Sequence, residues 1–115
     1  MADEDPVVSN PEHYRTLFEN EFVRVLEYKD APGERTTPHV HPNGVMITLT
    51  DFERRLSTPA GDREVTLSAN EAFWLPAQRH SGANIGDTPT HTIFVELKGA
   101  AAGVVDDSTL GPQAE

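Results

Sequence analysis

The residues with the clearest chemical potential in this chain are two histidines separated by a single residue. His39 and His41 lie in APGERTTPHVHPNG, residues 31–44, after a proline and before a turn. On a strand, residues two apart point to the same face, so both imidazoles would share one side of a sheet. Neutral imidazoles bind Zn, Cu, Ni or Fe, but two of them hold a metal weakly. A solvated strand edge is the alternative, and a third ligand would decide between the two.

A third histidine, His80, lies in the segment FWLPAQRHSGANIGD. It follows an apolar run at residues 73–75 that is typical of a buried strand, and Asn84 comes four residues later. Distant segments of a small sheet meet when the sheet closes or folds over, and ligand pockets form at barrel mouths. We therefore predict that His39, His41 and His80 together form a metal site.

The elements that must position these histidines are short strands. Residues 13–33 contain two apolar runs broken at residues 19–21, which predicts a hairpin. Residues 45–76 predict three more strands, with turns at residues 59–62 and 68–70, and residues 77–89 are loop-rich. THTIFVELKG then predicts a last strand in which His91, Ile93, Val95 and Leu97 share one face. Many short strands in one small domain indicate an antiparallel barrel or sandwich.

Length and composition restrict the function further. The chain has 115 residues, which suits one compact domain, and we expect a flexible arm at 1–12, a barrel at 13–98 and a flexible tail at 99–115. It has no cysteine, which excludes disulfides and thiolate ligands. A net charge of −10 argues against nucleic-acid and anionic-membrane partners. The acidic N-terminal segment and the lack of a long apolar run predict a cytoplasmic protein.

The two histidine segments resemble the motifs of the cupin superfamily. The first motif reads G-x5-H-x-H-x3-4-E-x6-G, and Gly33, His39 and His41 match it without a gap. The positions that usually supply its glutamate hold Val45 and Met46, and its last glycine is absent. The second motif reads G-x5-P-x-G-x2-H-x3-N. Its matching residues here are Pro76, His80 and Asn84, whereas Asn70 and Gln78 replace its glycines and the loop before the histidine is one residue shorter.

The resemblance covers about residues 14–98 and implies a small antiparallel jelly-roll β-barrel. A neutral set of three histidines, without the carboxylate, is similar to that of the three-histidine cupin dioxygenases. The implied cofactor is a divalent transition metal, iron first, with Zn, Ni, Mn and Cu as alternatives. Gln78 is a candidate fourth ligand, or a residue that orients a ligand. The resemblance also implies a homodimer, and exposed sheet edges give a physical reason for one.

Two classes of function follow. The first is a metal-dependent enzyme, dioxygenase-like, that acts on a small molecule in a pocket lined by Met46, Phe73, Trp74, His91 and Phe94. With a redox-inactive metal, an isomerase, lyase or hydrolase is the expected variant. No general base stands out, which leaves a metal-bound water, Glu71 or Glu96. The second class is a non-catalytic barrel that binds a small hydrophobic or sugar-like molecule. A stoichiometric metal would separate the two.

Overall fold

The computed structural model describes residues 4–106 and 108–113. These residues form nine strands, one short α-helix and one 3-10 helix. The elements in chain order are α1 (Pro6–Ser9), β1 (Tyr14–Glu19), β2 (Val23–Asp30), β3 (His39–His41), β4 (Gly44–Thr48), β5 (Phe52–Thr58), β6 (Gly61–Leu67), β7 (Ala72–Leu75), β8 (Gln78–Asn84), β9 (Thr90–Leu97) and η1 (Gly99–Ala102). Neither helix of this described part is long and apolar enough to span a bilayer.

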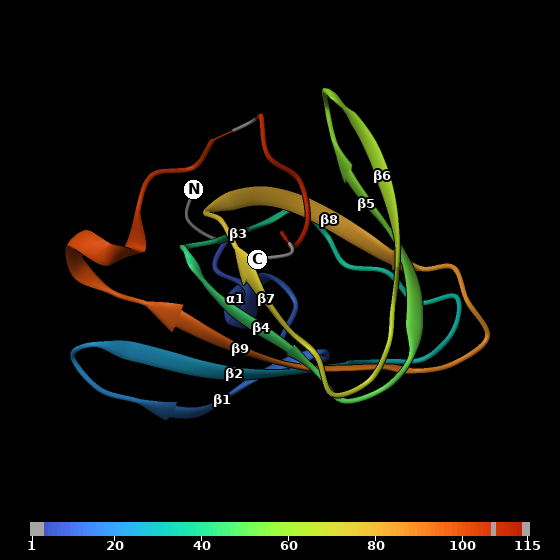
Figure 1. Cartoon of the computed structure of the whole chain (residues 1–115), viewed down its shortest axis with the longest axis horizontal. Helices are drawn as coiled ribbons and strands as arrows, with labels where there is room; N and C mark the ends of the chain where they lie inside the picture. The colour runs from blue at the N-terminus through green and yellow to red at the C-terminus, as the bar shows by residue number, and fades with distance from the viewer. Residues whose placement is uncertain (1–3, 107, 114–115) are drawn as a thin grey trace.

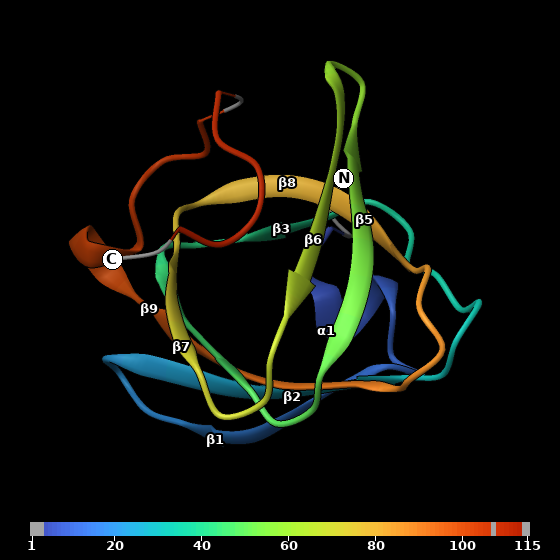
Figure 2. The same ribbon diagram turned by 45° about the vertical axis from the view of Figure 1, so that its right-hand side comes forward.

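The strands form two antiparallel sheets that enclose the interior from opposite sides (Figures 1 and 2). The larger sheet has the order β1-β2-β9-β4-β7, and the smaller has the order β3-β8-β5-β6. From β2 onward the chain alternates between the sheets, except at the β5-β6 hairpin. This is a jelly-roll arrangement, built from two facing sheets, and it confirms the predicted all-β class.

Alternating burial along the strands places one row of side chains from each strand in the interior. In β9, every second residue from Thr90 to Glu96 is buried, and β4 buries Gly44, Met46 and Thr48. The main apolar cluster contains Tyr14, Leu26, Tyr28, Met46, Leu75 and Phe94. All six lie on the larger sheet, and Leu67 of β6 in the smaller sheet packs against them. Burial of apolar surface between the sheets stabilises this packing.

Two segments differ from the sequence prediction. Residues 45–76 contribute to four strands, β4 to β7, where three were expected, because the chain turns at residues 49–51 although their side chains suit a strand. The predicted loop at residues 77–89 contains β8, which pairs with both β3 and β5. Pairing on both edges stabilises this strand in spite of its polar sequence, so His80 lies within a strand rather than after one.

The segments before and after the predicted barrel domain contact it. Asn10 is buried, and its side chain accepts a hydrogen bond from the backbone N–H of Thr37 and donates one to the carbonyl of the same residue. Near the C-terminus, Gly111 is buried and bonds the side chain of Gln78 in both directions. Both flanking segments thus contact the barrel, through Asn10 and through Gly111. The flexible arm, the tail and the boundaries 13–98 stay predictions.

Candidate metal centre

The structure brings His39, His41 and His80 together in the interior. His39 and His41 lie on β3, and His80 lies on the neighbouring strand β8, directly opposite His39. Cross-strand partners in an antiparallel pair point to the same face, which explains why three residues from two distant segments converge. Their ring nitrogens include a set that lies within 4.8 Å of one another. All three side chains are buried, so few other groups compete for this space.

Each of the three rings is fixed by a hydrogen bond at Nδ1. His39 Nδ1 lies 2.7 Å from the carbonyl oxygen of Thr37, and His80 Nδ1 lies 2.7 Å from Oε1 of Gln78. His41 Nδ1 lies 3.1 Å from a carboxylate oxygen of Glu96. All three partners are acceptors, so each Nδ1 carries the proton and each Nε2 keeps a free lone pair. This is the tautomer and the outer support that metal-binding histidines require.

Two of the rings, those of His39 and His80, are held in their neutral form. Burial and the neighbouring His41 lower the pKa of His39 to about 3. Burial, followed by the influence of His41 and His39, lowers the pKa of His80 well below its usual value. A proton on either of these two rings would be desolvated. His39 and His80 therefore offer uncharged nitrogen donors at neutral pH, which is the form that binds a metal.

Tyr14 is a further residue of the site that sequence reasoning missed. Its hydroxyl lies 3.3 Å from Nε2 of His39 and 3.4 Å from Nε2 of His41. Burial raises the pKa of Tyr14 well above its usual value, so the phenol stays protonated and can donate to either lone pair. The available signal is weak: Tyr14 is the first residue of a strand whose other side chains are exposed. Only its position opposite Tyr28 in the sheet places it in the interior.

The sequence left two roles open for Gln78, a fourth metal ligand or a residue that orients a ligand. Its hydrogen bonds support the second role. Its Oε1 accepts hydrogen bonds from His80 Nδ1 and the backbone N–H of Gly111, and its Nε2 donates to the carbonyls of Pro76 and Gly111. Both ends of the amide are thus occupied by groups that orient it. Gln78 therefore positions His80, and the C-terminal segment positions Gln78.

Glu96 also supports the site, because its two oxygens are already committed. One oxygen bonds His41, and the other accepts from Arg24, which in turn pairs with Asp5 near the N-terminus. Among the general-base candidates, Glu96 is buried in this network, and Glu71 is exposed on the loop before β7. The positions of the motif glutamate supply no ligand here. Val45 points away from the interior, and Met46 belongs to the apolar cluster.

A cavity of about 40 Å³ adjoins the histidines. Its walls are mainly apolar, and it is lined by two of the five predicted pocket residues, Met46 and Phe94. Phe73 packs against the apolar cluster without lining the cavity, and Trp74 is 42% exposed on the outer face of the larger sheet. Trp74 is opposite Val45, whereas Phe73 is opposite Met46, so adjacent residues of β7 face opposite sides.

His91, which was predicted to line the pocket, does not line the cavity. It is on the outer side of β9, where its Nε2 lies 2.7 Å from a carboxylate oxygen of Glu27. His91 and Phe94 are three residues apart on one strand, so they point to opposite faces and cannot both line the interior. The shared face of His91, Ile93, Val95 and Leu97 exists as predicted, but it is the outer one.

Comparisons with known proteins agree with this geometry. No family model matches the chain. Beta-alanine degradation protein BauB from Pseudomonas aeruginosa is 37% identical over 82 residues, which cover 70% of this chain and 84% of that protein. A cupin domain from Bordetella pertussis has a TM-score of 0.70 and 27% identity, over 75% of this chain and 92% of that one.

A protein with a double-stranded β-helix domain from Klebsiella pneumoniae shares the fold, with a TM-score of 0.59 and 20% identity over 87% of this chain and 82% of that one. The sheet order, the three inward histidines and these likenesses lead to one assignment. The chain belongs to the cupin superfamily.

Proposed function

We propose that this cupin is a metal-dependent enzyme that transforms a small molecule at a three-histidine centre, with oxygen-dependent oxidation, as in a dioxygenase, as the first candidate reaction. The observation that carries the proposal is the common arrangement of the three rings. Each has its Nδ1 bonded to a fixed acceptor, which leaves the three Nε2 lone pairs available. A structural role for three buried histidines would not require the same tautomer in all of them.

The residues present fit a divalent first-row ion. His39, His41 and His80 would hold it through Nε2, and neutral imidazoles suit iron, zinc, nickel or copper. Such an ion supplies Lewis acidity, and iron adds the ability to activate oxygen. Three protein ligands leave coordination positions open for a substrate. We propose iron first, in keeping with the neutral three-histidine set.

The chain's own groups would perform three tasks around that ion. Glu96 and Gln78 hold the rings of His41 and His80 in the binding tautomer. The Tyr14 phenol would donate a hydrogen bond to an anionic oxygen of a ligand at the centre, since it already points at the Nε2 atoms. The apolar cavity walls would exclude water from the reaction.

The relative from Pseudomonas is named for the degradation of β-alanine, a short-chain amino acid. A substrate of similar size, bound at the three histidines, would place only its far end in the small cavity of this chain. We therefore propose a small metabolite as substrate, with no nucleic acid or membrane partner. The chain is further proposed to act in the cytoplasm, which cell fractionation would test.

Elemental analysis of the untagged protein tests the metal centre. We expect close to one transition-metal ion per chain, and its loss in a His39→Ala, His80→Ala double variant. His13→Gln is the matched control, because His13 lies outside the cluster and bonds the backbone of Lys29. If the protein binds no metal, even after anaerobic reconstitution, the enzyme proposal fails and the non-catalytic binding barrel replaces it.

A homodimer is a second proposal, and the outer face of the larger sheet supports it. Phe18, Val25, Val95, Val45 and Trp74 are successive cross-strand partners and form an apolar row across five strands. A second copy of the chain would cover this row. We expect light scattering to give twice the chain mass, and Val95→Lys to give a monomer. A monomeric parent protein would contradict the proposal.

A further inference from the structure

The interior contains a buried hydroxyl without a hydrogen-bond partner. Thr92 is 2% exposed, and its Oγ1 is the single buried side-chain polar atom of the described residues that lacks a partner. Thr92 also lines the cavity beside the histidines. Proteins pair nearly all buried polar groups, because an unpaired one loses its hydration without compensation. An unpaired hydroxyl in the wall of a cavity therefore points to a group that binds there.

The position of Thr92 relates it to the metal centre. On the inner face of β9, Glu96 bonds the ring of His41, and Phe94 stacks on the same ring with centroids 4.9 Å apart. Thr92 is the next inward residue, about 7 Å further along the strand at the usual rise per residue. A molecule that reaches from the centre past Phe94 would therefore meet the hydroxyl of Thr92.

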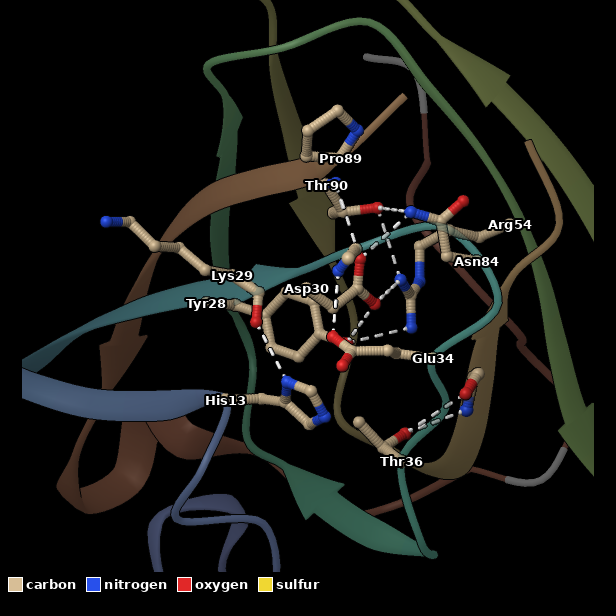
Figure 3. A network of polar contacts seen from close by, with 12 residues as sticks. His13, Tyr28, Lys29, Asp30, Glu34, Thr36, Arg54, Asn84, Pro89 and Thr90 are labelled. Carbon is tan, nitrogen blue, oxygen red and sulfur yellow. Dashed lines mark hydrogen bonds and ion pairs between the residues drawn. The ribbon is translucent and has the colours of Figure 1, made fainter. Parts of the chain in front are cut away.

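Three further lining residues of the cavity, Tyr28, Arg54 and Thr90, belong to a polar network (Figure 3). Arg54 donates hydrogen bonds to Asp30, to the hydroxyl of Tyr28 and to Thr90. Asn84 donates to the second oxygen of Asp30. Burial opposes the ionisation of Asp30, but the Arg54 guanidinium and the bonds to the carboxylate outweigh it and hold the pKa of Asp30 below its usual value.

The charge of Arg54 is thus compensated inside the wall. Its ion pair with Asp30 leaves the far end of the cavity without a net positive charge to attract an anion. A ligand group that reaches Thr92 is therefore favoured when it is uncharged and can form a hydrogen bond, because a charge there would be buried without a counter-charge. At the three histidines the preference would be for an anionic group, because a divalent ion bound by three uncharged imidazoles would keep its full positive charge.

The volume of the cavity sets the size of the ligand. A cavity of about 150 Å³ accommodates benzene, and a water molecule needs at least about 10 Å³. The cavity beside Thr92, at about 40 Å³, is too small for an aromatic or sugar ring. On the same scale it suits an acyclic group of roughly two or three non-hydrogen atoms, such as the end of a short chain whose other end lies at the histidines. The part of a ligand that enters this cavity is therefore not a ring.

We propose that the cavity binds short-chain acids that carry an uncharged hydrogen-bonding group at the other end, and that Thr92 Oγ1 recognises this group. The acid end rests on the proposed metal centre. The specificity for the other end comes from the Thr92 hydroxyl on the inner face of β9. Thr92 is thus a specificity-determining residue, separate from the histidines.

The test uses two probes of equal size, 3-hydroxypropionate and butyrate, which differ by a hydroxyl in place of a methyl group. Zn²⁺-loaded full-length protein avoids oxidation of the probes, and calorimetry measures both affinities. One additional hydrogen bond to the hydroxyl predicts about tenfold tighter binding of 3-hydroxypropionate, equal to about 1.4 kcal/mol. Thr92→Val should abolish this preference, and Thr92→Ser, which keeps the hydroxyl, should retain it.

A readout without ligand separates recognition from packing. Because Thr92→Val removes an unpaired hydroxyl at nearly constant volume, we expect its melting temperature to exceed that of the parent. Equal affinities of the parent protein for the two probes, or a preference for 3-hydroxypropionate that survives in Thr92→Val, would overturn the inference. Either result, with zinc bound, would leave the proposed metal centre unaffected. A protein that does not retain Zn²⁺ would overturn both, and zinc analysis distinguishes these two failures. An ordered water on Oγ1 with equal affinities for the probes also counts against the inference.

Discussion

Acidification should destabilise the metal-free protein through its buried histidines. In the folded state the pKa of His39 is about 3, against an ordinary value of 6.5 that holds in the unfolded chain. Between these values the unfolded state binds a proton that the folded state does not bind, so stability falls as the pH falls. Stability is fully present above pH 6.5 and is lost progressively toward pH 3. His80 acts in the same direction.

The magnitude follows from the difference in pKa. At pH 4.5 the unfolded-state His39 has gained its proton, and two pH units below 6.5 correspond to about 2.7 kcal/mol for this residue alone. A small domain has roughly 5–15 kcal/mol of stability in total, so this loss is measurable. Carboxylates whose folded pKa is lowered, such as Asp30 and Glu27, lose their contribution as the pH falls through their ordinary values of 3.8 and 4.5. The range from 6.5 to about 5.5 therefore reports mainly on the histidines, and comparison with His39→Gln isolates His39 at lower pH.

Urea unfolding in the presence of a chelator, followed by circular dichroism at several pH values, measures this dependence. His39→Gln should reduce the slope of unfolding free energy against pH by about 1.4 kcal/mol per pH unit. A parent protein with constant stability from pH 6.5 to 4.5, or an unchanged slope in His39→Gln, would refute the argument that burial keeps these rings neutral.

Three further outcomes follow from the groups around the rings. Tyr14→Phe removes the hydroxyl that can donate to the Nε2 of His39 or of His41, so it should destabilise the metal-free form by about 1–3 kcal/mol and the zinc-bound form by less, as thermal shift would show; equal losses would contradict this. Glu96→Gln should weaken zinc binding by about ten- to a hundredfold in chelator competition, because His41 loses its charged partner. Removal of residues 110–115 should weaken zinc binding in the same assay, since Gln78 loses Gly111, while an unchanged affinity would show that the tail does not support the site.

The sequence alone determined the fold class and the three histidines of the candidate site. The spacing of His39 and His41 requires a shared face on any strand, because side chains alternate with a period of two. A third histidine within a similar motif then restricts the topology to one that brings both segments together. The all-β class follows from strand period and turn residues, whereas the jelly-roll topology is what the resemblance to the cupin motifs implies. The topology and the histidine cluster both appear in the structure.

Only the tertiary structure decided which face of each strand is the interior. Alternation divides β9 into two rows, one with His91, Ile93 and Val95 and one with Thr92, Phe94 and Glu96, and hydrophobicity favours the first row as the inner one. The structure buries the second row, because its polar groups are needed inside, where Glu96 holds His41 and Thr92 lines the cavity. Tyr14, Gln78 and the C-terminal segment also reach the site through tertiary contacts. Packing between segments that are distant in the sequence sets their partners, and no local sequence pattern encodes such contacts.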